Sequence, residues 1–239
     1  MKIITNDISV SADQIADQVK ELLDDKPNAV LGLSFGKDLI PVYQKLKELG
    51  QAGELSFGDV RVFVCCEYRE LDKDHAGSIH SFMNANLFDG AGFSYANIFY
   101  PCLCSEDEEE LKEYDEQISA AGGIDLMILG IGVNGSIGFN EPATPFESYT
   151  HVQLLTDKTK NLVAEDFGGT ENVPEKGVTM GIKTIVSARN IDLIAAGEEK
   201  ADAVHKIVYG KTIPFVPASM LQIHMNLNLY VDSAAASDI

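Results

Sequence analysis

One stretch, residues 124–142, constrains the fold of this chain more than any other. Its first six residues are apolar except for Asp125 and lead directly into a glycine, a pattern typical of a strand buried on both faces of a parallel sheet. Its second half is rich in glycine, which lets a backbone turn tightly and approach a ligand closely. Ligands of open α/β sheets bind outside the carboxyl ends of the strands, so this loop is predicted to line a ligand site. The polar residues set among its glycines are Asn134, Ser136, Asn140 and Glu141.

The rest of the chain alternates between short apolar runs and amphipathic stretches. Strands are predicted over residues 29–34, 60–66, 98–100, 124–129, 151–155, 191–196 and 227–231. Helices are predicted over residues 11–23, 39–49, 201–208 and 217–224. This alternation predicts an α/β fold with a doubly wound, mostly parallel sheet and helices on both faces, Rossmann-like, in one domain over residues 1–239. Residues 234–239 are expected to form a loose tail.

The charge balance narrows the class of partner. The chain has 18 Lys and Arg residues against 37 Asp and Glu residues, a formal net charge of -19. A polyanion would be repelled, which argues against nucleic acid. An anionic small ligand would need a locally positive pocket. No apolar signal core or transmembrane-length run is present, so we expect a cytoplasmic protein without a membrane partner.

The four cysteines are Cys65, Cys66, Cys102 and Cys104. Their spacing does not fit a structural zinc site, and a cytoplasmic chain would keep them as reduced thiols. Both pairs fall near the ends of predicted strands, so they could converge in a thiol or metal site. Buried thiols are the simpler interpretation, and no metal or cofactor is expected.

The central loop matches two known patterns. Residues 130–135 fit the G-x-G-x-x-G dinucleotide fingerprint, but no clear helix follows, which makes that match weak. The longer run 130–142, GIGVNGSIGFNEP, resembles the signature loop of the glucosamine-6-phosphate deaminases, also called isomerases, whose usual form is G-x-G-x-D-G-H-I-A-F-N-E-P. The resemblance extends over about residues 31–231 and the superfamily also holds the phosphogluconolactonases. The ending Phe139-Asn-Glu-Pro142 favours the deaminase side.

The resemblance implies a phosphate site built from several loops. Lys200 matches the lysine of the family's G-x-x-K-A motif, which grips the phosphate. Gly36, Lys37 and Asp38 occupy the turn where the family has small hydroxyl residues, and Gly135 belongs to the central loop. Lys37 could bind phosphate as a point charge or form a solvated pair with Asp38 that caps the helix. Glu165 stands where the family supplies an arginine, which reverses the local charge.

The resemblance also implies a catalytic group, in which three positions differ. Ring opening in the family uses a histidine oriented by acids, and an aspartate then moves a proton between C1 and C2 before ammonia leaves. Ser136 stands in place of that histidine, Asn134 in place of an aspartate beside it, and Cys66 in place of the C2 aspartate. Glu67 and Glu141 agree with the family. Serine and asparagine do not titrate near neutral pH, and Cys66 would act as a base only with a lowered pKa.

Three interpretations follow from these substitutions. The chain could be a weakened or altered isomerase or deaminase with relocated groups such as Glu67 and Glu141. It could be a non-catalytic binder or sensor of sugar phosphates. It could instead use a thiol or metal site at the cysteines. The expected ligand is a phosphorylated amino sugar or a related sugar phosphate, and the oligomeric state is not determined, a monomer being compatible with the sequence.

Overall fold

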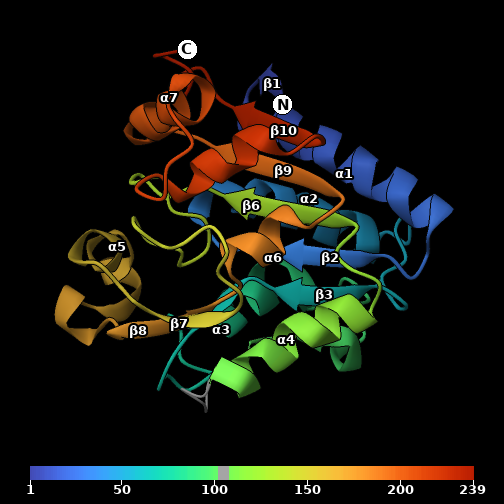
Figure 1. The fold of residues 1–239 in the computed structure, drawn as a ribbon. Coiled ribbons are helices and arrows are strands. Elements are labelled where there is room, and N and C mark those ends of the chain that lie inside the picture. Colours follow the sequence, from blue (N-terminus) through green and yellow to red (C-terminus); the bar gives the residue numbers. More distant parts are fainter. Residues whose placement is uncertain (102–107) are drawn as a thin grey trace.

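The centre of the protein is a seven-stranded sheet in which all neighbouring strands are parallel. The structure is a computed structural model that describes residues 1–101 and 108–239. Across the sheet the strands run in the order β1 (Lys2–Thr5), β10 (Leu227–Val231), β9 (Asn190–Ala195), β6 (Leu126–Gly130), β2 (Val30–Leu33), β3 (Arg61–Val64) and β5 (Ile98–Phe99) (Figure 1). The predicted fold class is confirmed.

Helices cover both faces of this sheet. On one face lie α1 (Ile8–Asp25) and α2 (Ile40–Gln51), which pack against each other; on the other lie α4 (Glu108–Ala120), α6 (Ile182–Val186) and α7 (Ala201–Tyr209) (Figure 1). Each crossover within this sheet joins two parallel strands, and such crossovers are right-handed as a rule. Crossovers that move across the sheet in opposite directions therefore place their helices on opposite faces. In the described part of the chain, no helix is long and apolar enough to cross a membrane.

A second, smaller sheet stands beside the first. Its three antiparallel strands are β4 (Cys66–Tyr68), β8 (Lys176–Thr179) and β7 (His151–Leu154). The strand predicted over residues 60–66 is therefore two strands. The N–H of Cys65 bonds to Leu33 of the main sheet, whereas its carbonyl accepts from Met180, which directly follows β8, at 2.7 Å in both cases. The chain changes partners at this residue, which a continuous β-branched run did not indicate.

Other departures lie at the two ends of the chain. Strand β1 was not predicted, because its four residues gain strand structure only by pairing with β10. The late helix is the 3-10 helix η7 (Pro217–Ile223) instead of an α-helix. Residues 234–239, expected to be a loose tail, form a turn against the body: Ala235 is fully buried, and its N–H donates to Asp232 at 2.7 Å.

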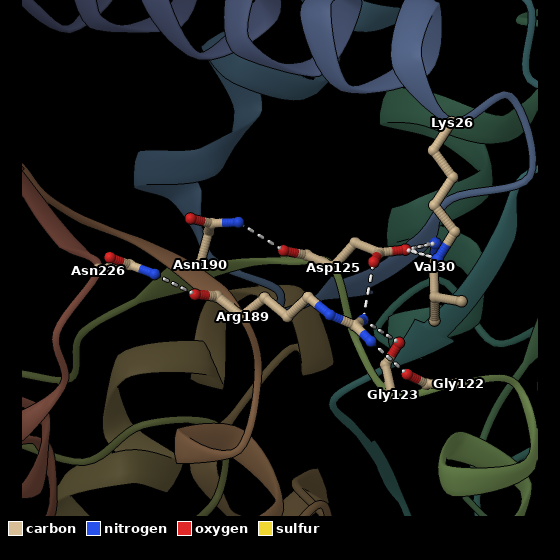
Figure 2. A network of polar contacts seen from close by, with 8 residues as sticks. All are labelled: Lys26, Val30, Gly122, Gly123, Asp125, Arg189, Asn190 and Asn226. Carbon is tan, nitrogen blue, oxygen red and sulfur yellow. Dashed lines mark hydrogen bonds and ion pairs between the residues drawn. The ribbon is translucent and has the colours of Figure 1, made fainter.

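A polar network ties together the amino ends of the central strands. Asp125, which directly precedes β6, is buried and accepts hydrogen bonds from the backbone N–H of Val30 and from Lys26 and Arg189 (Figure 2). These bonds measure 2.8, 2.7 and 2.8 Å. Because three segments far apart in sequence meet at one carboxylate, we assign this network to stability.

At the carboxyl ends of the strands, the direction in which the chain moves across the sheet reverses between β2 and β6. After β2 the chain continues through α2 to β3 on one side, whereas β6 joins β2 on the other side and leads on to β9. Loops at such a switch point diverge above and below the sheet and leave a crevice at the carboxyl ends of the strands. The loops concerned begin at Ser34 and Ile131.

Candidate functional site

A cavity of about 220 Å³ lies at this switch point. Its walls come from five segments: the turn after β2, α3 (Ile79–Met83), the end of β6 with the loop after it, η6 (Glu198–Lys200), and α5 (Asp157–Val163) with the residues after it. The residues that line it are Ser34, Phe35, Gly36, Lys37, Asp38, Phe82, Gly130, Ile131, Gly132, Val133, Ser136, Gly138, Phe139, Thr159, Leu162, Val163, Asp166, Glu199 and Lys200. Five predicted site residues are among them: Gly36, Lys37, Asp38, Ser136 and Lys200.

One side of the cavity is aromatic. The ring of Phe35 meets Phe139 edge-on with centroids 5.3 Å apart, and it meets Phe82 in the same manner at 6.5 Å. Phe139 in turn packs against Tyr68 at 5.0 Å. Edge-to-face contacts of this kind fix ring orientation and add to the burial energy. The cavity thus offers a rigid apolar surface beside its polar groups.

The glycine-rich loop holds Ser136 at the cavity. Gly135 adopts a φ of +83°, and a Cβ there would lie 2.8 Å from Val216, so both conformation and space require glycine. The N–H of Gly132 donates to the Ser136 carbonyl at 2.9 Å, and the N–H of Ser136 donates to Asn134 Oδ1 at 3.1 Å. Gly135 therefore acts through the backbone of the loop, and it does not itself line the cavity.

Asn134 and Glu141, both part of this loop, form a polar cluster with two threonines. Asn134 Nδ2 donates to Glu141 Oε2 at 2.8 Å, and the other carboxylate oxygen accepts from Thr159 Oγ1 and from the backbone and hydroxyl of Thr156, both at 3.2 Å. Glu141 is buried and is an acceptor in each of these bonds. The cluster joins the central loop to the start of α5, which covers the cavity.

Cys66 and Glu67 lie in β4, outside the cavity lining. Cys66 is fully buried, and this burial raises the pKa of its thiol well above the ordinary value, with the adjacent Cys65 adding to the effect. A thiol in this setting stays protonated at neutral pH.

The Glu67 carboxylate accepts hydrogen bonds from three backbone N–H groups. Its two oxygens accept the N–H groups of Tyr68, Ile79 and His80 at 2.7, 3.0 and 2.7 Å. Burial raises its pKa, and these backbone bonds partly offset that rise. Two of the three donors belong to the first residues of α3 (Ile79–Met83), so Glu67 anchors the start of that helix.

The two lysines that line the cavity are already paired. Lys200 Nζ donates to the Ile131 carbonyl and lies 3.5 Å from Asp38 Oδ2. Lys37 reaches Glu165 at 3.5 Å, with both side chains exposed, so Lys37 and Asp38 do not pair with each other as the capping alternative required. Burial raises the pKa of Asp38, and Lys200 offsets part of that rise.

Two of the four cysteines lie in the part of the chain that the structure describes. Cys65 and Cys66 are buried and free, whereas Cys102 and Cys104 lie outside the described residues. Among residues 1–101 and 108–239, no group of three His, Cys, Asp or Glu side chains is arranged to hold a metal ion. Convergence of the four cysteines stays an open alternative to buried thiols.

Several cavity residues were not singled out from the sequence. Thr156 and Thr159 bind Glu141, and Asp166 and Glu199 line the cavity. Thr156 caps α5, since its hydroxyl accepts from the Thr159 N–H at 3.3 Å. That capping pattern was readable in the sequence, but it gave no sign that the same hydroxyls reach a carboxylate at residue 141.

Comparison with known proteins identifies the family to which this sequence is similar. Residues 7–229 match the model of the family described as glucosamine-6-phosphate isomerases/6-phosphogluconolactonase. The glucosamine-6-phosphate deaminase of Thermoanaerobacter sp. (strain X514) is 42% identical over 98% of this chain and 93% of its own length. That of Staphylococcus haemolyticus (strain JCSC1435) is 40% identical over 96% of each chain.

Solved structures agree with this assignment. A monomeric glucosamine-6-phosphate deaminase, described as a missing link of the NagB superfamily, superposes with a TM-score of 0.95 at 35% identity and covers all of both chains. The 6-phosphogluconolactonase of Thermotoga maritima shares the fold, with a TM-score of 0.74 at 21% identity over 96% of this chain and 97% of its own. The chain therefore belongs to the glucosamine-6-phosphate isomerase/6-phosphogluconolactonase family.

Proposed function

We propose that this chain is a glucosamine-6-phosphate deaminase-like protein of amino-sugar phosphate metabolism that binds an amino sugar in the switch-point cavity and releases ammonia from it only slowly. The family membership and the 42% identical deaminase support the ligand class. The position of the cavity at the carboxyl ends of β2 and β6 supports the site.

The slow turnover rests on one observation. The residues at the three proton-handling positions of the resembled motif are Asn134, Ser136 and Cys66, and none of them titrates near neutral pH in this setting. General acid–base groups typically contribute on the order of 10²–10⁴ in rate each, although such losses are not additive. We therefore expect a large loss of ordinary deaminase activity.

A non-catalytic binder or sensor is the second candidate, and the set of hydrogen bonds around Glu141 favours it. The buried carboxylate retained at the ring-opening position, Glu141, is an acceptor in all the bonds described for it, from Asn134, Thr156 and Thr159. A carboxylate surrounded by donors is well suited to orienting a loop and poorly suited to passing a proton onward.

The test is a parallel assay of binding and turnover with glucosamine 6-phosphate. We expect calorimetry to detect binding and ammonia release to fall about a hundredfold or more below that of the Thermoanaerobacter deaminase. Glu141→Gln serves as the control, since any residual activity of the cavity should fall further in it, whereas activity from a contaminant should not. Turnover near that of the reference enzyme would refute slow chemistry, and absence of binding would refute the ligand class.

A further inference from the structure

Lys200, the more buried of the two lysines that line the cavity, is already paired with a carboxylate of the protein. Its Nζ donates to the Ile131 carbonyl and lies 3.5 Å from Asp38 Oδ2. The side chains of Lys200 and Asp38 are 15% and 16% exposed, so solvent screens this pair weakly. A phosphate that approached the ammonium would meet the Asp38 carboxylate as well.

Asp38 is held in this position by its place in the fold. It lies in η1 (Lys37–Leu39), which leads directly into α2, and the same Oδ2 faces the N–H of Ala196 at 3.4 Å. Ala196 follows β9, so the carboxylate links the turn after β2 to the carboxyl end of β9. Moving Asp38 aside for a phosphate would cost it both partners.

The other charged residues of the lining do not replace the positive charge that Asp38 offsets at Lys200. Lys37, the other ammonium in the lining, lies 3.5 Å from Glu165. Two further carboxylates, Asp166 and Glu199, line the cavity beside Asp38. The described lining thus holds three carboxylates against two ammonium groups, an acidic balance of the same sign as the net charge of -19 for the whole chain. Such a field disfavours a dianion and favours the ammonium group of an amino sugar.

We propose that Asp38 is a specificity-determining residue which, by holding Lys200, removes most of the affinity that a phosphate group would add and lets the cavity bind an amino sugar with or without that group. This rests on the proposed function, in that the ligand is an amino sugar bound in this cavity. The aromatic surface formed by Phe35, Phe82 and Phe139 is available to the sugar in either case.

The experiment measures a ratio of affinities. The intact chain is titrated calorimetrically with glucosamine 6-phosphate and with glucosamine, at one pH and ionic strength. We expect the wild-type dissociation constants to agree within about tenfold. In Asp38→Asn, which keeps the shape of the side chain, and in Asp38→Ser, the ratio should move by about tenfold or more toward the phosphate ester, because Lys200 becomes free to bind it.

The matched control is Asp202→Asn. Asp202 lies on the surface of α7 and pairs with Lys206, so its substitution changes the net charge by the same amount without touching the cavity. A wild-type preference for the phosphate ester of about a hundredfold or more would overturn the proposal. An affinity ratio that moves no further in the Asp38 variants than in Asp202→Asn would also overturn it.

The outcomes separate the two proposals. If neither sugar binds to the wild-type chain, the proposed function fails and this inference fails with it. If both sugars bind and the ratio is insensitive to Asp38, this inference alone fails. Thermal unfolding of each variant verifies that it folds, and Asp38→Asn carries the test if the serine variant does not.

Discussion

The side-chain amide of Asn134 lies 2.8 Å from Oε2 of Glu141 and donates a hydrogen bond to it. In the motif that this loop resembles, an aspartate occupies the position of Asn134, so a neutral donor here replaces a second acid. The contact connects the central loop to the segment that covers the cavity, because Thr156 and Thr159 bind the other oxygen of the same carboxylate.

Asn134→Asp should destabilise the protein at neutral pH. Two carboxylates at this distance cannot both ionise freely, so the pKa of one of them would rise above its value in the unfolded chain. Stability would then be lost as pH rises through that range and recovered as pH falls. We expect a loss of about 1–3 kcal/mol at pH 7 that vanishes near pH 4. Asn134→Ala, which removes the bond without adding charge, should show a pH-independent loss in the same denaturant titrations.

Ser136→His should raise ammonia release. Ser136 lines the cavity, and a histidine there would bring a group with an ordinary pKa of about 6.5 to the ligand. We expect a gain of about tenfold or more, since a single general acid–base group contributes on the order of 10²–10⁴ when fully positioned. Ser136→Gln, similar in size but not titratable, is the control. An equal gain in both variants would show that proton transfer is not what the wild-type chain lacks.

Asp192→Asn should stabilise the protein above pH 6. Asp192 is fully buried in β9, where it accepts from Asn228 at 2.9 Å, and burial raises its pKa from 3.8 to about 6. Because the folded state holds the proton more tightly than the unfolded state, the native protein loses stability as pH rises from about 4 to 6. The neutral amide avoids that loss, which amounts to roughly 2–3 kcal/mol at pH 7. The melting temperatures of Asp192→Asn at pH 4 and pH 7.5 should coincide, whereas those of the wild-type protein should differ.

Asp125→Ala should destabilise the fold and leave the cavity unchanged. The substitution leaves the Val30 N–H and the nearby Lys26 and Arg189 without their buried acceptor (Figure 2). We expect a loss of about 2–4 kcal/mol in the free energy of unfolding. Asp202→Ala, which removes an exposed pair with Lys206, should cost below about 0.5 kcal/mol. A change in sugar affinity in the Asp125 variant would contradict the assignment of this network to stability.

Much of the fold was predictable because its strands are short apolar runs separated by helices. Residues 124–129 and 191–196 were predicted as buried strands, and β6 and β9 are buried along nearly their whole length. The break at Cys65 was not predictable, since the hydrophobic run continues through it while the hydrogen-bond partners change from Leu33 to Met180. Strand β1 likewise depends on β10, which follows it by more than two hundred residues.

The candidate site was predictable in its location and less so in its contacts. The glycine-rich loop and the turn at Gly36 were expected at the carboxyl edge of the sheet, and both line the cavity. The pairing of Lys200 with Asp38 was not expected, because it joins residues 162 positions apart whose adjacency depends on the order of the strands. The hydrogen bonds that Glu67 accepts from the start of α3 likewise depend on the folded arrangement of separate segments.

The central claim is that the cavity binds an amino sugar while the side chains that would move its protons have been replaced. The most direct measurement follows exchange of the C2 hydrogen of glucosamine 6-phosphate with deuterium from the solvent, by NMR, at protein concentrations that saturate binding. The account predicts bound sugar with exchange about a hundredfold or more slower than that produced by the Thermoanaerobacter deaminase. Exchange as fast as that produced by the Thermoanaerobacter deaminase would contradict it.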